Sequence, residues 1–185
     1  QQLARVKLGH AMLMLLRGVP TIYSGDEQGF VGDGGDQDAR EPLFPAKVAV
    51  YNDNRLIGTS ATTAEANFDT SHPLYVHIKA LAQVRQSDPA LQRGEQRILE
   101  AATDTPGLFA VARRLPQSNR APFLDTIVMF NTSAQPLKAN VMIDPRIDVT
   151  KSLYGNCPMP AAPGTLSVEI EPFGSLVCAG AVAVR

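Results

Sequence analysis

The sequence contains no tryptophan, only 2 cysteines, no long hydrophobic run and no excess of charge of either sign. Its 17 lysine and arginine residues balance 18 aspartate and glutamate residues, so it offers no electrostatic field to nucleic acid or to an anionic membrane. No apolar run approaches the roughly 18 residues that a spanning helix needs. The run at 11–16, for instance, is bounded by His10 and Arg17. These absences exclude a dedicated polyanion-binding protein and a chain that crosses a membrane.

The two cysteines, Cys157 and Cys178, cannot form a zinc site by themselves and allow a single intrachain pairing. A bridge would close a loop of about 21 residues and would contribute roughly 3 kcal/mol. Cys178 lies in an apolar, strand-like run, whereas Cys157 lies in a proline-rich loop. The pattern favours two reduced thiols over a disulfide, and it leaves the cellular compartment open.

The first ninety residues predict two helices, one buried strand and a long loop. Apolar residues recur at three- and four-residue spacing from Leu3 to Leu16, which predicts a helix that Gly18 terminates. The short apolar run Val19–Tyr23 is typical of a strand buried on both faces, as in a parallel sheet. Residues 24–71 show no periodicity, and loops of this length are usually functional. A second helix begins at Pro73 and ends before residues 88–89.

The second half changes to the two-residue period of strands. Leu166, Val168 and Ile170 face one way while Ser167 and Glu169 face the other, which is typical of an antiparallel sheet with one solvated face. Turn-forming pairs separate the short runs. These runs are Leu108–Arg113, Thr126–Phe130, Lys138–Ile143, Leu166–Ile170 and Ser175–Ala179. The pattern predicts an antiparallel β-sandwich of six to eight strands.

The predicted buried strand at 19–23 lacks neighbours, because the first ninety residues supply no second convincing strand. An eightfold barrel needs about 250 residues, so this region could supply only its last helix–strand–helix. The sequence also begins at Gln1 without an initiator methionine, which leads us to expect a longer parent. We therefore expect an α/β plus all-β chain. Residues 1–94 would form the C-terminal piece of a (β/α)8 barrel, with an active-site-rim loop at 24–71, and residues 95–185 an antiparallel β domain.

Three segments resemble the α-amylase family of glycoside hydrolases, glycoside hydrolase family 13. Residues Gly18–Phe30, with the sequence GVPTIYSGDEQGF, are similar to the family's last barrel strand. Residues Gly34–Pro45, GGDQDAREPLFP, resemble its acidic, glycine-rich loop that precedes an arginine and a proline-containing turn. Residues His72–Gly94, HPLYVHIKALAQVRQSDPALQRG, resemble the final barrel helix and its exit to the C-terminal β domain. The matches cover nearly the whole chain, in the order of the family.

This resemblance implies a parent enzyme that cleaves α-linked glucans or maltooligosaccharides with retention of configuration. Such an enzyme flanks the scissile bond with two carboxyl groups about 5 Å apart. In the family, the catalytic carboxylates lie on earlier barrel strands, upstream of Gln1. We therefore assign no catalytic residue in this chain, Asp36 and Asp38 included, and we expect the chain alone to be inactive.

Four residues remain as candidates around the barrel mouth. Asp26 and Glu27 are adjacent on an extended segment, so they point to opposite sides and cannot clasp one bond. We expect them to be structural at the barrel mouth, where they would bind loop backbone. Tyr23 could line the mouth and contact substrate, although a core position is favoured. The resemblance implies that Arg40 binds sugar hydroxyls, and the alternative is a surface arginine paired with a nearby acid.

The sequence predicts no metal site and no cofactor in this chain. His10, His72 and His77 lack the four-residue spacing of zinc-binding helices. Asp33, Asp36 and Asp38 loosely resemble a calcium loop but lack its ligand spacing and terminal glutamate. Calcium remains an option only for the absent part of the parent.

Two other functions stay open. A non-catalytic relative would keep the barrel for protein interaction, and an independent β module could bind glycans. Sheet-based sugar binding commonly uses exposed aromatic rings, and the absence of tryptophan argues for a structural role of the β domain. As partners we expect the missing N-terminal barrel portion or another copy of the chain, and neither nucleic acid nor membrane. We expect an extracellular or periplasmic location rather than a cytoplasmic one.

Overall fold

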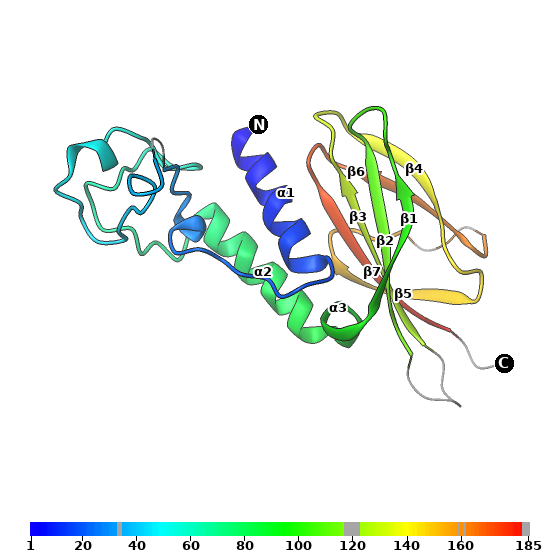
Figure 1. Cartoon of the computed structure of the whole chain (residues 1–185). Coiled ribbons are helices and arrows are strands. Elements are labelled where there is room, and N and C mark those ends of the chain that lie inside the picture. The colour runs from blue at the N-terminus through cyan, green and yellow to red at the C-terminus, as the bar shows by residue number, and fades with distance from the viewer. Residues whose placement is uncertain (33–34, 117–122, 159, 161, 183–185) are drawn as a thin grey trace. The chain divides into compact units, whose positions relative to one another are not determined.

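The computed structural model describes residues 1–32, 35–116, 123–158, 160 and 162–182 (Figure 1). Its helices are α1 (Gln2–Leu15), α2 (Pro73–Ser87) and α3 (Pro89–Arg93), with short 3-10 helices η1 (Asp26–Gln28) and η2 (Ala49–Tyr51). Its strands are β1 (Glu95–Ala101), β2 (Leu108–Leu115), β3 (Leu124–Asn131), β4 (Leu137–Met142), β5 (Ile147–Tyr154), β6 (Thr165–Ile170) and β7 (Ser175–Val182).

The chain divides into two compact units. The first, here the β unit, comprises Leu3–Val19 and Leu81–Arg185, together with Gln1. The second, here the loop unit, comprises Pro20–Ala80, together with Gln2. These units reflect contacts within this chain, whereas the predicted boundary at residue 94 refers to a barrel completed by other residues. That boundary therefore stays a prediction.

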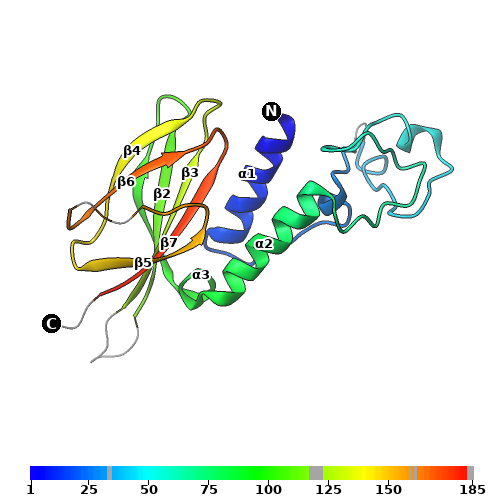
Figure 2. The same cartoon turned by 180° about the vertical axis from the view of Figure 1, so that it is seen from behind.

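The β unit contains two antiparallel sheets. Five strands follow the order β1-β2-β3-β7-β5, and β4 pairs with β6 in a separate two-stranded sheet. Figure 2 shows β4 and β6 on one side of the larger sheet and the helices α1 and α3 on the other. This architecture confirms the predicted antiparallel sandwich.

The core of the sandwich lies between the two sheets. Side chains that alternate along the strands, such as Ile127 and Met129 of β3, pack there against Leu166 and Val168 of β6. The intervening residues Val128 and Phe130 are also fully buried but belong to the opposite face, which α3 covers. Strand β3 is therefore buried on both faces, which explains its almost unbroken apolar sequence.

Two arginines satisfy the backbone carbonyls at the end of α1. Arg113 of β2 is 1% exposed, and it donates to the carbonyls of Leu15 (2.9 Å) and Gly94 (3.0 Å). Arg85 of α2 donates to the carbonyls of Met14 (2.7 Å) and Gly18 (2.7 Å). The last carbonyls of a helix have no partner within the helix, so these guanidinium groups perform the role that the sequence suggested for Gly18. Burial lowers the pKa of both arginines.

The structure differs from the sequence prediction at residues 19–23. This segment is extended but pairs with no strand of the described residues, and Val19 is 91% exposed. The physical reason is that a sheet strand needs hydrogen-bonding neighbours, and the described part of the chain offers none beside it. The lone strand that the sequence predicted is thus left without a sheet.

The cysteines also differ from the favoured interpretation, because Cys157 and Cys178 form a disulfide. Their Cα atoms lie 5.7 Å apart, within the range that a bridge requires. Cys178 sits on β7 with its side chain fully buried, and Cys157 packs against the same core. The sequence placed the two residues in different local contexts and gave no sign that folding brings them together.

Among the described residues, no helix is both long enough and apolar enough to cross a lipid bilayer.

Candidate functional site

A tight turn at the start of the loop unit positions two of the predicted residues. Gly25 and Gly29 flank η1 with left-handed φ angles of 103° and 74°, which favour glycine. A Cβ atom on Gly29 would lie 2.3 Å from the carbonyl oxygen of Ile57. The backbone itself therefore requires glycine here, because Ile57 donates its N–H to the Gly29 carbonyl at 2.7 Å.

The carboxylates of Asp26 and Glu27 bind the backbone of this turn. Asp26 Oδ2 accepts the N–H of Tyr23 at 3.1 Å, and Glu27 Oε2 accepts the N–H of Gly25 at 3.0 Å. Hydrogen bonds to turn backbone are a structural use of a carboxylate and leave it poorly placed for proton transfer. Whether these residues lie at a barrel mouth stays a prediction.

The other two candidates lie on the surface of the loop unit. Arg40 donates to Asp36 Oδ2 at 2.5 Å, and the side chains of the two residues are 62% and 83% exposed. This pair matches one of the two alternatives for Arg40 and does not test sugar binding. Tyr23 is 62% exposed, so in this chain its ring is outside a core. The predicted residues Asp33 and Gly34 lie outside the described residues.

Sequence reasoning missed the contact that closes the long loop. Gln28 is buried, and its amide exchanges two hydrogen bonds with the backbone of Asp69, at 3.1 and 3.0 Å. Asp69 in turn accepts from the hydroxyl and the N–H of Ser71, and these bonds lower its pKa. The sequence signal was the Asp69-Thr70-Ser71 turn pattern just before α2. This contact joins residues 41 positions apart and makes the loop a folded unit.

No cluster of three or more histidine, cysteine, aspartate or glutamate side chains suited to a metal ion occurs within the described ranges. His72 is buried instead at the start of α2, where its Nδ1 accepts the N–H of Leu74 at 3.2 Å.

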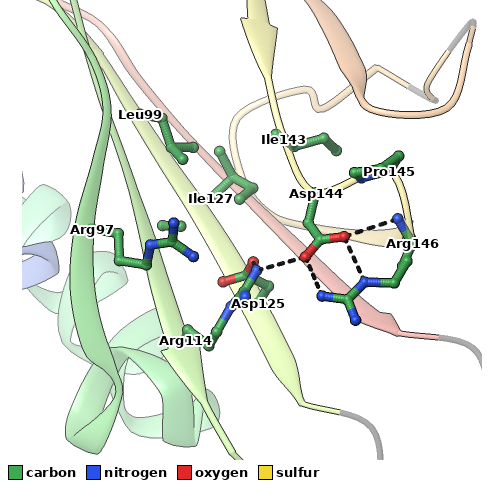
Figure 3. A pocket seen from close by; sticks show the side chains of 10 residues that line it. Arg97, Leu99, Arg114, Asp125, Ile127, Ile143, Asp144, Pro145 and Arg146 are labelled. Carbon is green, nitrogen blue, oxygen red and sulfur yellow. Dashed lines mark hydrogen bonds and ion pairs between the residues drawn. The ribbon is translucent and has the colours of Figure 1, made fainter.

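The β unit contains a pocket that sequence reasoning did not find, here called the end pocket. Its volume is about 440 Å³, which is within the range of small-molecule sites. Figure 3 shows its charged side chains on one side and Leu99, Ile127 and Ile143 on the other. The pocket is lined by Arg97, Leu99, Ala112, Arg114, Asp125, Ile127, Ile143, Asp144, Pro145 and Arg146.

Ion pairs link most of the charges of the end pocket. Arg114 pairs with Asp125 at 2.6 Å and with Asp144 at 3.3 Å, and Arg146 pairs with Asp144 at 2.7 Å (Figure 3). Hydrogen bonds from Arg146 hold the pKa of Asp144 well below its usual range. Phe123 packs beside the same groups, with the Arg114 guanidinium 3.8 Å from its ring centre. A sequence cannot reveal this pocket, because its residues come from three strands and a turn.

Two curated proteins show sequence similarity to the chain. An α-amylase from Streptomyces lividans is 49% identical over 111 residues, which are 60% of this chain and 12% of that protein. A β/α-amylase from Paenibacillus polymyxa is 33% identical over 93 residues, or 50% of this chain and 6% of that protein. The chain is related to α-amylases. No family model matches the sequence.

Solved structures agree on the fold of this α-amylase relative. An α-amylase from Anoxybacillus superposes with a TM-score of 0.68 at 18% identity, and it covers 100% of this chain and 34% of its own. A debranching enzyme from Nostoc punctiforme gives 0.64 at 22% identity, with 95% of this chain and 31% of its own covered. The chain thus spans about a third of these enzymes. The predicted resemblance and the predicted fold class are confirmed.

Proposed function

We propose that the chain is the C-terminal part of a retaining glycoside hydrolase that acts on α-glucans or maltooligosaccharides. The observation that supports this most directly is the 49% identity to an α-amylase over 111 residues. The chain contributes a structural β domain and the rim of the substrate cleft, while the residues that break the glycosidic bond belong to the upstream part of the parent.

The chemistry of a retaining enzyme supports this division of roles. One carboxyl group attacks the sugar and a second one, about 5 Å away, protonates the leaving oxygen. Asp26 and Glu27 are adjacent, and both already bind turn backbone, so they do not form such a pair. The chain alone therefore has no hydrolytic activity.

Arg40 is the residue of this chain that contacts the sugar, with a smaller contribution from Tyr23. The exposed pair with Asp36 is weak in water, so sugar hydroxyls can replace it at little cost. The Arg40 guanidinium has five N–H donors in a fixed fork, which suits vicinal hydroxyl groups. Asp26 and Glu27 hold the turn that begins this rim.

The partner of the chain is the N-terminal barrel portion of the parent. Val19–Tyr23 is extended and unpaired within the described residues, so it is available as a strand of a sheet completed by that portion. The chain itself holds no cofactor, and any calcium of the parent binds upstream. The disulfide between Cys157 and Cys178 supports an extracellular or periplasmic location, where such bonds persist.

The first experiment compares the isolated chain with the parent protein on maltoheptaose. We expect new reducing ends from the parent only, and NMR should detect the α-anomer first. A parent that binds maltoheptaose without cleaving it would favour the non-catalytic interaction protein. Cleavage by the isolated chain would contradict the proposed division of roles.

The second experiment tests Arg40 in the parent. Arg40→Ala should raise KM for maltoheptaose about tenfold, because charge-assisted hydrogen bonds to the sugar are lost. Arg55→Ala, which removes an exposed arginine elsewhere in the loop unit, is the matched control and should leave KM unchanged. Equal KM values for the parent and the Arg40→Ala variant would assign Arg40 to the surface pair with Asp36.

A further inference from the structure

The charges of the end pocket do not cancel. Its lining residues alternate in sign, with Arg97, Arg114 and Arg146 against Asp125 and Asp144. Three guanidinium groups face two carboxylates, so the lining has one excess positive charge, however the groups pair with one another. The guanidinium groups remain charged at any pH that the fold tolerates.

The hydrogen-bonding groups of the pocket are unbalanced in the same direction. The Asp144 carboxylate already accepts the backbone N–H and two side-chain groups of Arg146 and one group of Arg114. These four bonds use the roughly four acceptor sites of a carboxylate. The side chain of Arg97 has no hydrogen bond or ion pair with the described residues. Donors therefore exceed acceptors, and a matching ligand brings acceptors.

The acceptors of Asp125 are not available to a ligand either. Asp125 is 1% exposed, its Oδ2 accepts from Arg114 at 2.6 Å, and its Oδ1 is buried without a partner among the described residues. A neutral sugar would bring hydroxyl protons that need acceptors, so this lining disfavours a sugar. An anionic group instead finds free N–H donors and the excess charge.

The remaining wall of the pocket is apolar. Leu99, Ile127 and Ile143 line it opposite the charged groups (Figure 3). An inorganic anion would leave this wall against water. An organic anion with a short aliphatic chain covers the wall and gains roughly 25 cal/mol for each Å² of apolar surface that it buries.

We propose that the end pocket binds a small aliphatic carboxylate, with its carboxylate on Arg97 and its alkyl chain against Leu99, Ile127 and Ile143. This site lies in the β unit and uses none of the residues proposed for glucan binding. It does not depend on the proposed glycosidase activity, because it is built from the folded strands of this chain.

The first test needs no variant. The ¹⁵N-labelled 185-residue chain is titrated with hexanoate, with hexanol as the uncharged analogue, with phosphate as the inorganic anion and with maltose as the sugar. We expect hexanoate to shift the amide signals of residues 97, 114, 125 and 144–146 in a saturable manner, at least tenfold more tightly than hexanol or phosphate. Equal binding of phosphate, preferential binding of maltose, or no saturable shift with hexanoate would each overturn the proposal.

The second test changes the charge at two neighbouring positions. Arg97→Gln should weaken hexanoate binding at least tenfold, and it should fold normally because Arg97 is exposed on the edge strand β1. Glu95 lies opposite Arg114 in the strand register but does not line the pocket, so Glu95→Gln should tighten binding. Arg93→Gln, which removes an exposed arginine of α3, is the matched control and should change the Kd less than twofold. Equal weakening by Arg97→Gln and Arg93→Gln would refute the assignment of Arg97.

Discussion

At the scale of single residues, Arg113 makes the clearest energetic demand on the fold. Its guanidinium is buried and satisfies the carbonyls of Leu15 and Gly94, at 2.9 and 3.0 Å. A buried carbonyl that loses its donor costs about 1–3 kcal/mol. Arg113→Met keeps most of the side-chain volume but removes both donors. We expect it to lower the free energy of unfolding by about 2–4 kcal/mol, measured by urea denaturation with far-UV circular dichroism.

The control for this variant is Arg93→Met on the exposed surface of α3, which should change the free energy of unfolding by less than about 0.5 kcal/mol. If Arg113→Met were as stable as the wild type, the two carbonyls would be satisfied in another way, and Arg113 would not be required at the end of α1.

Asp144 should make the β unit sensitive to acid. Its folded-state pKa is held below the ordinary value of 3.8, mainly by hydrogen bonds from Arg146. A depressed pKa stabilises the fold above the unfolded-state value, and this stability is lost as the pH falls below about 4. Asp144→Asn should cost about 1–2 kcal/mol at pH 7 and flatten the loss of stability between about pH 4 and pH 2. Melting temperatures over this range measure both effects.

The matched variant for this prediction is Asp148→Asn on β5, whose carboxylate has no printed bond to an arginine of the pocket. It should leave the acid slope unchanged. Parallel acid slopes for the wild type and Asp144→Asn would mean that the ion pairs of Asp144 contribute nothing to the stability of the β unit.

The sequence predicted individual side chains only where their partners are local. Asp26 and Glu27 were expected to bind loop backbone, and their partners, Tyr23 and Gly25, lie within three residues. The partners of Arg113 lie 98 and 19 residues away, and the two cysteines are separated by 21. Their bonding depends on strand pairing, which no local pattern specifies.

At the scale of elements, the turn around η1 determines whether the loop unit can fold. Gly29 combines a left-handed φ angle with a close approach to the Ile57 backbone. Gly29→Ala places a methyl group against that carbonyl, and we expect a loss of about 2–3 kcal/mol together with faster hydrogen exchange across residues 25–30. Gly35→Ala is the control, since a Cβ there has open space and no unusual φ angle is present. Identical exchange in both variants would argue against a tightly packed turn.

Elements with a strong local period were predicted well. The second helix was placed between Pro73 and Asp88, and α2 is Pro73–Ser87. The alternating run at Leu166–Ile170 forms β6. Strand β1 was missed because most of its residues are exposed, so its sequence shows no alternation. The pairing of β7 between β3 and β5 is non-local, and periodicity contains no information about which strands pair.

At the scale of the whole molecule, the unpaired segment at residues 19–23 remains exposed. An apolar, extended segment with free backbone groups is a template for pairing with another chain. In the absence of the parent's barrel, we expect the isolated chain to self-associate through it. Sedimentation velocity should show species above 19.9 kDa as the concentration rises.

Two variants separate backbone pairing from general stickiness. Thr21→Pro removes one N–H donor from the segment, and Val19→Lys adds a charge to a side chain that is 91% exposed; each should weaken self-association at least fivefold. Ile98→Lys, at a position 66% exposed on β1, is the control and should leave it unchanged. A chain that stays monomeric at every concentration, or that responds equally to Val19→Lys and Ile98→Lys, would show that residues 19–23 do not seek a partner strand. In the parent protein the same substitutions should instead lower the melting temperature, because the segment would then be buried.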